Sequence, residues 1–418
     1  MRLHPIDDTN LFSYTVCVFS DFIKMNAARQ MSKQKKSSDL VLYNTIAHCP
    51  RVAAIDLGTN SCRLSVAAIN IASLHRNFFK IKNSNERKIK IVDSLARVVC
   101  LGEGLKQTNL LSKNAIDRTI DALNICRIKM ENHNVTYVRT VATEACRQAK
   151  NAEVLIEKAK DVIGIEIEII PPREEARLVL KGCIGVMSKY KNYGIVLDIG
   201  GGSTEIIWLK IDKRRNNRQL DLSVIDSMSL PYGVVTLRDT YIHDNHNVQA
   251  YQIVQQTIHQ TLKFFVTKNK IMSYFKNNEV QIVASSGTVT TLASIALGLR
   301  TYDRTAIDGK TFKAKDLLIA GNNILSLYLN NNSPNSALSN EQFLLQRQII
   351  LLQPRNAFHE SFEVETHRFG LLAAGTVILS SIFEVIGHHD ICIADRGVRE
   401  GIIHDVIDSI LSTDYSKT

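Results

Sequence analysis

Two similar segments, each with a strand-like run, an aspartate and a glycine turn, constrain this chain more than any other feature. In the first segment an apolar run ends at Asp56, and the turn begins at Gly58. In the second segment the run ends at Asp198, and three successive glycines follow at residues 200–202. In both segments polar residues come next, and a second apolar run completes the unit. The repetition predicts two similar half-molecules that face each other.

Each glycine turn suits the binding of an anion. Glycine allows backbone conformations that other residues avoid, and it lets the chain approach a ligand closely. Successive backbone N–H groups can then point at one phosphate. The second turn lacks the Gly-Lys-Ser/Thr of a P-loop, and a strand-like run, residues 206–209, follows it in place of a helix. An ordinary glycine-rich hairpin is the alternative, and the second copy of the unit argues against it.

A third turn follows the strand-like run over residues 280–284. Ser286 and Gly287 lead from this run into an apolar, helix-like segment. The N-terminus of a helix is another favourable place for an anion, because backbone N–H groups point outward there.

An arginine lies where the predicted strand over residues 135–142 passes into a helix. Thr143 is placed to cap this helix, so Arg147 lies about one turn in, near the open edge of the sheet. Arginine suits the binding of phosphate oxygens, because its planar guanidinium can donate two parallel hydrogen bonds. The alternative is an arginine on the exposed surface of a helix.

Two adjacent acids, Glu174 and Glu175, lie in the first turn of a helix that begins after Pro172. The helix dipole favours acids at this end, which is sufficient to explain one of them. The functional interpretation is that one of the two points into a cleft as a general base. The spacing alone does not say which one.

Strand-like and helix-like runs alternate along both halves, which is typical of an α/β fold with mixed sheets. The predicted strands cover residues 51–69 as a hairpin, 89–99, 135–142, 165–170, 195–209 as a second hairpin, 221–227 and 280–284. One predicted helix, residues 151–164, carries Val154, Leu155, Ala159 and Val162 on its apolar side.

The chain of 418 residues is long enough for two or three domains, and its 45% of hydrophobic residues can fill their cores. It carries 51 Lys and Arg against 41 Asp and Glu, a formal charge of +10. This excess suits an anionic partner such as nucleic acid, acidic lipid or a polyphosphorylated small molecule. The basic residues do not gather in one element, and no nucleic-acid-binding motif is evident. Nucleic acid is therefore not an expected partner.

The eight cysteines are scattered and form no CxxC pair, so the sequence predicts no structural zinc site. Most of them lie in apolar runs, where they are expected to be small buried side chains. Such cysteine usage fits a reducing, cytoplasmic compartment.

Two apolar segments raise the question of a membrane. Residues 11–23 are interrupted by Asp21 and lack a cleavage-like site, so we expect residues 1–50 to be a disordered extension rather than a signal peptide. Residues 369–386 are numerous and apolar enough to span a bilayer, but Glu384 and several small polar residues interrupt them. We therefore expect a buried helix here and no membrane association.

Five motifs resemble, in order and spacing, the exopolyphosphatase/guanosine pentaphosphate phosphohydrolase (Ppx/GppA) family. They are Asp56-Leu-Gly-Thr-Asn-Ser61, Ala142-Thr-Glu-Ala-Cys-Arg147, Glu174-Glu-Ala-Arg-Leu178, Asp198-Ile-Gly-Gly-Gly-Ser-Thr-Glu205 and Ser286-Gly-Thr288. The resemblance implies the actin-like ATPase superfamily, with two actin-like (ribonuclease H-like) domains and a cleft between them. The expected domains are residues 51–175 and 176–394, and residues 395–418 are expected to form a helix that packs back on the first domain.

The resemblance also implies a reaction and the residues that perform it. The family removes the terminal phosphate from polyphosphate, from guanosine pentaphosphate or from both, with Mg²⁺. By position, Glu175 matches the base that activates water, and Asp198 and Glu205 match the acids at the metal and the water. The implied phosphate-binding residues are Gly58, Thr59, Asn60, Ser61, Arg63, Arg147, Gly200, Gly201, Gly202, Ser203, Thr204, Ser286 and Gly287. Acids beside a polyanion would repel it without a cation, which agrees with a metal.

Two departures from the family pattern affect what we expect. Pro171 and Pro172 stand where many relatives have Ser-Gly, which can restrict the entry into the helix of Glu175. Longer relatives continue into a helical C-terminal half, whereas this chain ends at Thr418. We therefore expect a short, two-domain form with less surface for long polymers.

Two other functions stay open at this point. One is an ATP-dependent kinase or ATPase of the same superfamily, and the other is a non-catalytic protein that senses guanosine pentaphosphate. All the acids are present, which argues against the sensor. The family also implies a cytoplasmic homodimer. The preference for one substrate or chain length depends on the width of the cleft and a few side chains, so the sequence does not give it.

Overall fold

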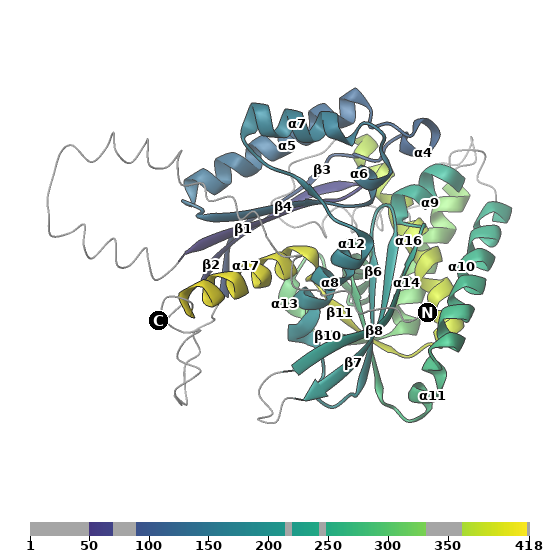
Figure 1. The fold of residues 1–418 in the computed structure, drawn as a ribbon. Coiled ribbons are helices and arrows are strands. Elements are labelled where there is room, and N and C mark those ends of the chain that lie inside the picture. The colour runs from purple at the N-terminus through teal and green to yellow at the C-terminus, as the bar shows by residue number, and fades with distance from the viewer. Residues whose placement is uncertain (1–49, 70–88, 214–219, 242–247, 332–361, 416–418) are drawn as a thin grey trace, which may run out of the picture.

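The computed structural model describes residues 50–69, 89–213, 220–241, 248–331 and 362–415. They form two lobes, each built around one β-sheet, with two helices between the sheets (Figure 1). The extension expected over residues 1–50 lies outside the described residues, apart from residue 50.

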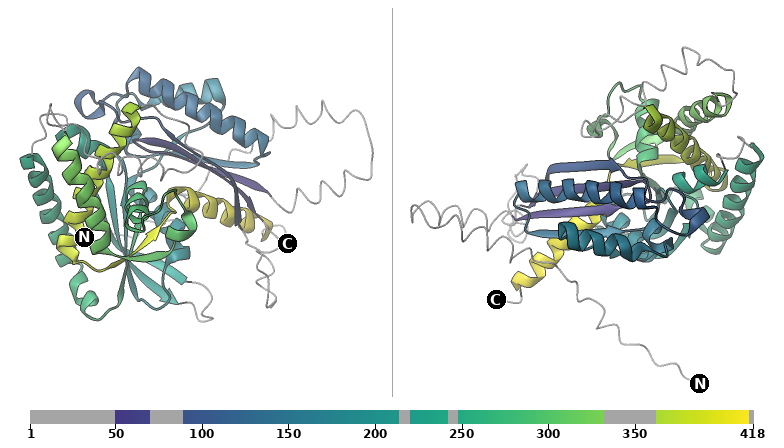
Figure 2. Two further views of the ribbon diagram at one scale, coloured as in Figure 1. Left: turned by 180° about the vertical axis from the view of Figure 1, so that it is seen from behind. Right: turned by 90° about the horizontal axis from the view of Figure 1, so that it is seen from above.

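The sheet of the first lobe has the strand order β3-β2-β1-β4-β5. Its strands are β1 (Arg51–Leu57), β2 (Ser61–Ile69), β3 (Ile89–Val98), β4 (Tyr137–Ala142) and β5 (Glu168–Ile169). β1, β2 and β3 form an antiparallel meander, and β4 and β5 continue the sheet parallel to β1. The helices α5 (Lys113–Asn132) and α7 (Ala152–Ile163) lie side by side on its outer face, away from the second lobe (Figure 2). Two short helices, α4 (Leu105–Thr108) and α6 (Glu144–Gln148), follow β3 and β4.

The sheet of the second lobe has the strand order β10-β11-β9-β6-β7-β8. Its strands are β6 (Tyr193–Ile199), β7 (Thr204–Lys213), β8 (Leu220–Leu230), β9 (Val280–Ser285), β10 (Lys310–Lys313) and β11 (Asp390–Ala394). One face is covered by α9 (Val234–Tyr241), α10 (Val248–Lys268), α12 (Gly287–Ala296), α14 (Ala314–Asn331) and α16 (Phe362–Ile386). The short helices α11 (Ile271–Lys276) and α13 (Arg304–Ile307) join neighbouring elements.

The two sheets repeat one design. The order β3-β2-β1-β4-β5 corresponds to β8-β7-β6-β9-β11, with the same strand directions at every pairing, and β10 is an additional edge strand. The registers also correspond, because Asp56 pairs with Arg63 in the first hairpin and Asp198 pairs with Glu205 in the second. The predicted pair of similar halves, with mixed sheets flanked by helices, is confirmed.

Two helices, α8 (Pro172–Cys183) and α17 (Val398–Tyr415), cross closely between the sheets (Figure 1). Gly182 lies against the carbonyl group of Gly397, and Gly401 lies against the carbonyl group of Leu178. A Cβ at Gly182 or Gly401 would overlap these main-chain atoms, so the crossing depends on glycine at both positions.

One hydrophobic core joins the two lobes through this helix pair. It includes Val52 of β1, Leu178 of α8, Ile402 of α17 and Val196 of β6. α17 packs on β1 and β2 as well as on α8. Because both sheets bury their inner faces against the same two helices, the lobes share part of their stability. The expected domain boundary between residues 175 and 176 falls inside α8.

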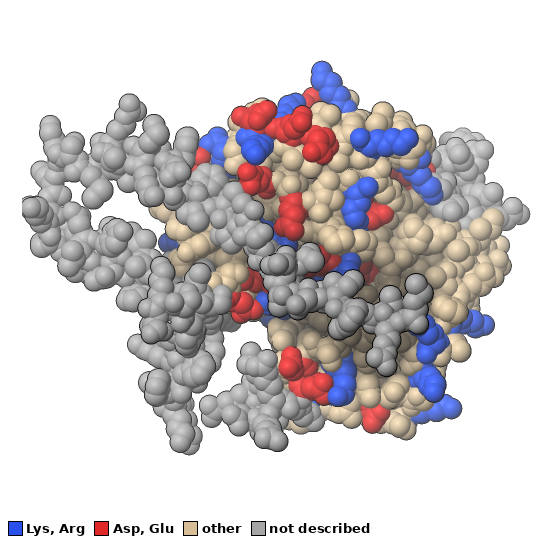
Figure 3. All heavy atoms as spheres, viewed as in Figure 1, with Lys and Arg blue, Asp and Glu red and all other residues tan. Residues whose placement is uncertain are grey.

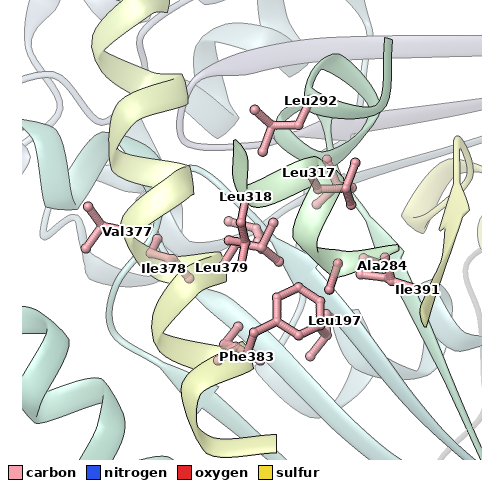
Figure 4. Packing of buried hydrophobic residues seen from close by; sticks show 14 of the residues in the cluster. Leu197, Ala284, Leu292, Leu317, Leu318, Val377, Ile378, Leu379, Phe383 and Ile391 are labelled. Atoms are coloured by element: carbon pink, nitrogen blue, oxygen red, sulfur yellow. The ribbon is translucent and has the colours of Figure 1, made fainter. Parts of the chain in front are cut away.

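The long apolar helix α16 belongs to the core of the second lobe. Within the described ranges, Phe369–Ile386 is the single helical segment that is long and apolar enough to cross a membrane, and 83% of it is buried. Ile378, Leu379 and Phe383 point toward other buried side chains, among them Leu197 of β6 (Figure 4). The expectation of a buried helix is confirmed.

The predicted apolar side of α7 is partly wrong. Leu155 and Ala159 are buried, but Val154 is 51% exposed and Val162 is 63% exposed. Ala152 and Ile163 are the other buried residues of α7, so the buried stripe follows a spacing of three or four residues. Val154 and Val162 each precede a residue of that stripe and are therefore rotated away from it by about 100°.

Two other local predictions differ from the structure. Thr143 precedes α6, but its side chain makes no capping hydrogen bond, and its N–H donates to Leu57 O at 3.2 Å. The strand expected over residues 165–170 is limited to β5, because only Glu168 and Ile169 pair with β4.

We predict that Leu155→Ala lowers the free energy of unfolding by roughly 2–5 kcal/mol, because it removes a buried side chain and leaves a cavity beside α5. The matched change Val162→Ala on the same helix should cost less than about 0.5 kcal/mol, because this side chain lies in water. Urea unfolding followed by circular dichroism measures both values. Equal losses for the two variants would contradict the packing of α7.

Candidate active site

The two glycine turns meet at the inner edges of the lobes, and both are closed by the same hydrogen bond. In the first turn the Gly58 N–H donates to Ser61 O at 3.0 Å. In the second turn the Gly200 N–H donates to Ser203 O at 2.9 Å. Because the N–H groups of Gly58 and Gly200 are bonded within their own turns, a ligand at the junction would have to bind other groups of the turns.

Glycine allows the turns to approach each other closely. A Cβ at Gly201 would lie 3.1 Å from the Cβ of Thr59 and 3.3 Å from the backbone nitrogen of Asn60. A Cβ at Gly202 would lie only 2.6 Å from Thr59 Oγ1. The hydroxyl of Thr59 is buried and has no hydrogen-bond partner among the described residues. A buried hydroxyl without a partner is costly, which points to a ligand atom at this junction.

The polar side chains after the second turn are organised around Glu205. Ser203 donates to Glu205 Oε1 at 2.7 Å, and Ser229 of β8 donates to the same oxygen at 2.9 Å. The other oxygen, Glu205 Oε2, is buried and has no partner in the part of the chain that the structure describes. The hydroxyl of Thr204 points elsewhere and donates to Tyr232 O at 2.7 Å.

Carboxyl groups from both lobes lie close enough to disfavour one another's charge. Burial raises the pKa of Asp198 to about 8, and Glu205 and Asp56 add to the increase. Burial also raises the pKa of Glu205 and of Asp56. For Glu175, burial and then the charge of Glu205 hold the pKa well above its usual range. The acids therefore form one electrostatically coupled group across the junction.

The structure distinguishes between the two adjacent acids of α8. Glu175 is 8% exposed and lies near the acids of the second lobe, and its Oε2 accepts a hydrogen bond from Arg147 Nη1 at 2.8 Å. Glu174 is instead bound by Arg139 at 3.1 Å and Arg177 at 2.7 Å. Of the pair, only Glu175 is placed to act on a molecule between the turns.

The guanidinium of Arg147 forms ion pairs with two carboxylates in this structure. Its guanidinium donates to Glu144 Oε2 at 2.6 Å, to Glu175 Oε2 at 2.8 Å and to Ile170 O at 2.8 Å. A phosphate oxygen would have to share or displace one of these carboxylates. Arg147 thus lies at the predicted place, beside the junction, but its charge is balanced by Glu144 and Glu175.

Arg63 reaches from the first lobe to the third predicted turn. Its Nε donates to Ser61 Oγ at 3.2 Å, and its Nη2 would lie 3.4 Å from a Cβ at Gly287. Ser286 caps α12, since its hydroxyl accepts a hydrogen bond from Val289 N. A guanidinium and a helix N-terminus therefore converge here, which favours an anion between them.

Sequence reasoning missed two residues of the site. Glu144 binds Arg147 and lies beside Gly202, and Ser229 donates to Glu205. The position of Glu144, three residues before Arg147, is a signal that could have identified it. Ser229 has no such signal, because it reaches the site only through the pairing of β7 with β8.

A small hollow lies beside the junction of the turns. Thr59, Lys106 and Glu144 line it from the first lobe, and Gly202 and Asp239 line it from the second.

Asp198 and Glu205 fit a divalent cation that takes its remaining ligands from water or phosphate oxygens. Within the described ranges, no group of three or more His, Cys, Asp or Glu side chains is placed to hold a metal by itself. Glu205 Oε2 has no partner, however, and Asp198 lies opposite it on the neighbouring strand. Carboxylate oxygens are the donors that Mg²⁺ prefers, and this ion usually keeps water or phosphate oxygens as further ligands.

Two lobes with corresponding strand orders, each with an aspartate and a glycine turn at the junction, define the class of two-domain proteins with the actin-like fold. Within this class, the family model described as the Ppx/GppA phosphatase family matches residues 80–410. The chain belongs to this family, and the predicted resemblance is confirmed.

Named relatives agree with this assignment. Exopolyphosphatase 2 of Mycobacterium tuberculosis is 30% identical over 278 residues, which cover 64% of this chain and 77% of that protein. A guanosine-5'-triphosphate,3'-diphosphate pyrophosphatase of Vibrio parahaemolyticus is 26% identical over 367 residues, which cover 87% of this chain and 61% of that protein. The crystal structure of the Aquifex aeolicus family member has a TM-score of 0.59 and 25% identity, covering 86% of this chain and 99% of that one. The predicted fold class and the predicted class of enzyme, a hydrolase, are confirmed.

We predict that metal-free protein loses stability as the pH rises, and that Asp198→Asn removes part of this loss. The folded-state pKa of Asp198, about 8, lies above its ordinary value of 3.8, so the folded state binds more protons between these values. Stability therefore falls over this interval, and the asparagine variant should gain relative to the wild type between about pH 5 and about pH 8. Urea unfolding in EDTA at both pH values measures the gain. A difference between the proteins that stays constant with pH would contradict the burial of this carboxyl group.

Proposed function

We propose that this protein is a Mg²⁺-dependent phosphohydrolase that releases terminal orthophosphate from polyphosphate, guanosine pentaphosphate or both. The observation that carries the proposal is the placement of Glu175. It is a buried carboxyl group with a raised pKa, held by an arginine and close enough to Glu205 and Asp198 for their charges to raise that pKa. A base in such a place can orient a water molecule toward a phosphate bound between the turns.

The remaining residues have roles that follow from their contacts. Arg147 exchanges one carboxylate partner for phosphate oxygens, and the Thr59 hydroxyl donates to the same phosphate. Arg63 and the N-terminus of α12 hold the phosphates that follow in the substrate. Asp198 and Glu205 would hold Mg²⁺, whose charge neutralises the developing negative charge on the phosphate. Phosphoryl transfer depends mainly on such positioning and charge stabilisation.

The surroundings of Glu175 affect both its basicity and its orientation. Its raised pKa makes the carboxylate a stronger base than an exposed one, and the hydrogen bond from Arg147 keeps a fraction of it ionised and fixes its orientation.

Both substrate classes are supported by the named relatives, one an exopolyphosphatase and the other a pyrophosphatase of a guanosine nucleotide. On the face drawn in Figure 3, basic and acidic side chains are interspersed and form no continuous basic track.

A cytoplasmic location and a homodimer are also part of the proposal. The six cysteines in the described part of the chain are free thiols, as expected in a reducing compartment. Sedimentation velocity would test the homodimer.

The experiment that tests the proposal measures orthophosphate release from polyphosphates of several lengths, from guanosine pentaphosphate and from ATP. We expect release from at least one of the first two, loss of the activity in EDTA and recovery with Mg²⁺, because the acids repel a polyanion without a cation. Transfer of phosphate from ATP to an acceptor would instead identify a kinase. Tight binding of guanosine pentaphosphate without any release would identify a sensor.

We predict that Glu175→Gln lowers kcat on the order of 10²–10⁴-fold, because glutamine cannot accept the proton of the attacking water. Substrate should still bind, since the phosphate-binding groups are unchanged. Steady-state kinetics and equilibrium binding measure the two effects. Glu157→Gln, on the exposed side of α7, is the control and should match the wild type. Unaltered turnover of the Glu175 variant would remove this residue from the role of base.

A further inference from the structure

We propose that Asp405, on the C-terminal helix α17, is a positioning residue for Glu175 and acts through Arg139 and Glu174. The inference rests on the proposed role of Glu175 as the base, and it assigns a role in the reaction to a residue far from the glycine turns. The link joins three elements that meet beside the start of α8, namely α17, β4 and α8 itself.

Asp405 is the centre of a network of ion pairs. Its carboxylate accepts hydrogen bonds from Arg139 Nη1 at 3.2 Å, from Arg177 Nη1 at 3.0 Å and from Lys181 Nζ at 2.6 Å. Three cations on one carboxylate require further anions nearby. Glu174 supplies one of them, since it binds Arg139 at 3.1 Å and Arg177 at 2.7 Å. Asp405 and Glu174 are thus tied together by two shared arginines.

The network is shielded from water at its centre. The side chains of Arg139, Asp405 and Glu174 are 12%, 16% and 18% exposed. Although burial alone would raise the pKa of Asp405, its hydrogen bonds with Arg177 and Lys181 lower it below the usual range. Pairs with so little exposure are weakly screened, so their geometry is restrained more strongly than that of surface ion pairs.

Glu174 transmits this restraint to Glu175 because the two residues are neighbours in the first turn of α8. The N–H groups of both residues donate to Pro171 O, at 3.0 and 3.1 Å. The first turn is therefore held by its own backbone on one side and by the Glu174 side chain on the other. Any rotation of this turn would move the Glu175 carboxylate relative to Arg147. A displacement of 1 Å at a reacting group can cost about 100-fold in rate.

Asp408 offers a matched comparison on the same helix. It also binds Lys181, at 2.5 Å, but its side chain is 66% exposed, whereas that of Asp405 is 16% exposed. A change at Asp408 removes a charge of the same sign from α17 without touching the link to the first turn of α8.

The test compares Asp405→Asn with Asp408→Asn in the full chain, with the substrate on which the wild type is most active. We expect Asp405→Asn to lower kcat roughly 10- to 100-fold and to leave KM within about twofold, because it disturbs the base rather than the phosphate-binding groups. Asp408→Asn should leave both parameters within about twofold of the wild type.

A double-mutant cycle separates positioning from a general structural effect. In the Glu175→Gln background the base is already absent, so Asp405→Asn should lower the residual rate by less than about twofold. If Asp405→Asn lowers the rate by the same factor in this background as in the wild type, the inference is overturned, because the effect would then be independent of Glu175. If Asp405→Asn does not fold, Glu174→Gln breaks the same link from α8 and carries the same expectations.

Two failures can be told apart. If the wild type releases no phosphate from any substrate, the proposed function fails and this inference fails with it. If the wild type is active and the Asp405 and Asp408 variants have the same kcat, the inference alone is overturned.

Discussion

The mutual repulsion of buried carboxyl groups is the constraint on which the rest of this structure depends. Asp198 and Glu205 belong to the second lobe, Glu175 belongs to α8 between the lobes, and their charges disfavour one another. Such a group persists only if the surrounding fold is stable enough to hold it and if cations balance it during function. Arg147 is one such cation, and a metal ion is the second that the geometry accommodates.

The helix pair α8 and α17 supplies the stability that this arrangement needs. Both sheets bury their inner faces on these helices, and the glycines at the crossing let the two backbones touch. A contact of this kind tolerates little displacement, because interiors are close-packed and do not deform continuously. Glu175, the proposed base, is therefore carried by a closely packed helix between the lobes rather than by a loop.

Much of the fold could be predicted from the sequence, because the strand–Asp–Gly–strand units are local patterns and the helices have clear periodicity. The site was only partly predictable. Both Glu174 and Glu175 satisfy the rule for a first helical turn. The choice between them depends on Arg139, which binds Glu174, and on Arg147, which binds Glu175, and both arginines belong to other elements. Ser229 reaches Glu205 only through strand pairing, and the error at Val162 arose because periodicity fixes the spacing of an apolar stripe better than its rotation.

The matching registers of the two hairpins have a consequence for the direction of the bound substrate. Asp56 faces Arg63 in one lobe, and at the equivalent place Asp198 faces Glu205 in the other. The backbone is duplicated, but the charge at the second position is reversed. A row of phosphates laid across the junction would therefore experience an electric field with a defined polarity, attractive at one end and, without a counterion, repulsive at the other. The two lobes thus combine a repeated backbone with unequal charges, which would give a bound chain of phosphates a preferred direction.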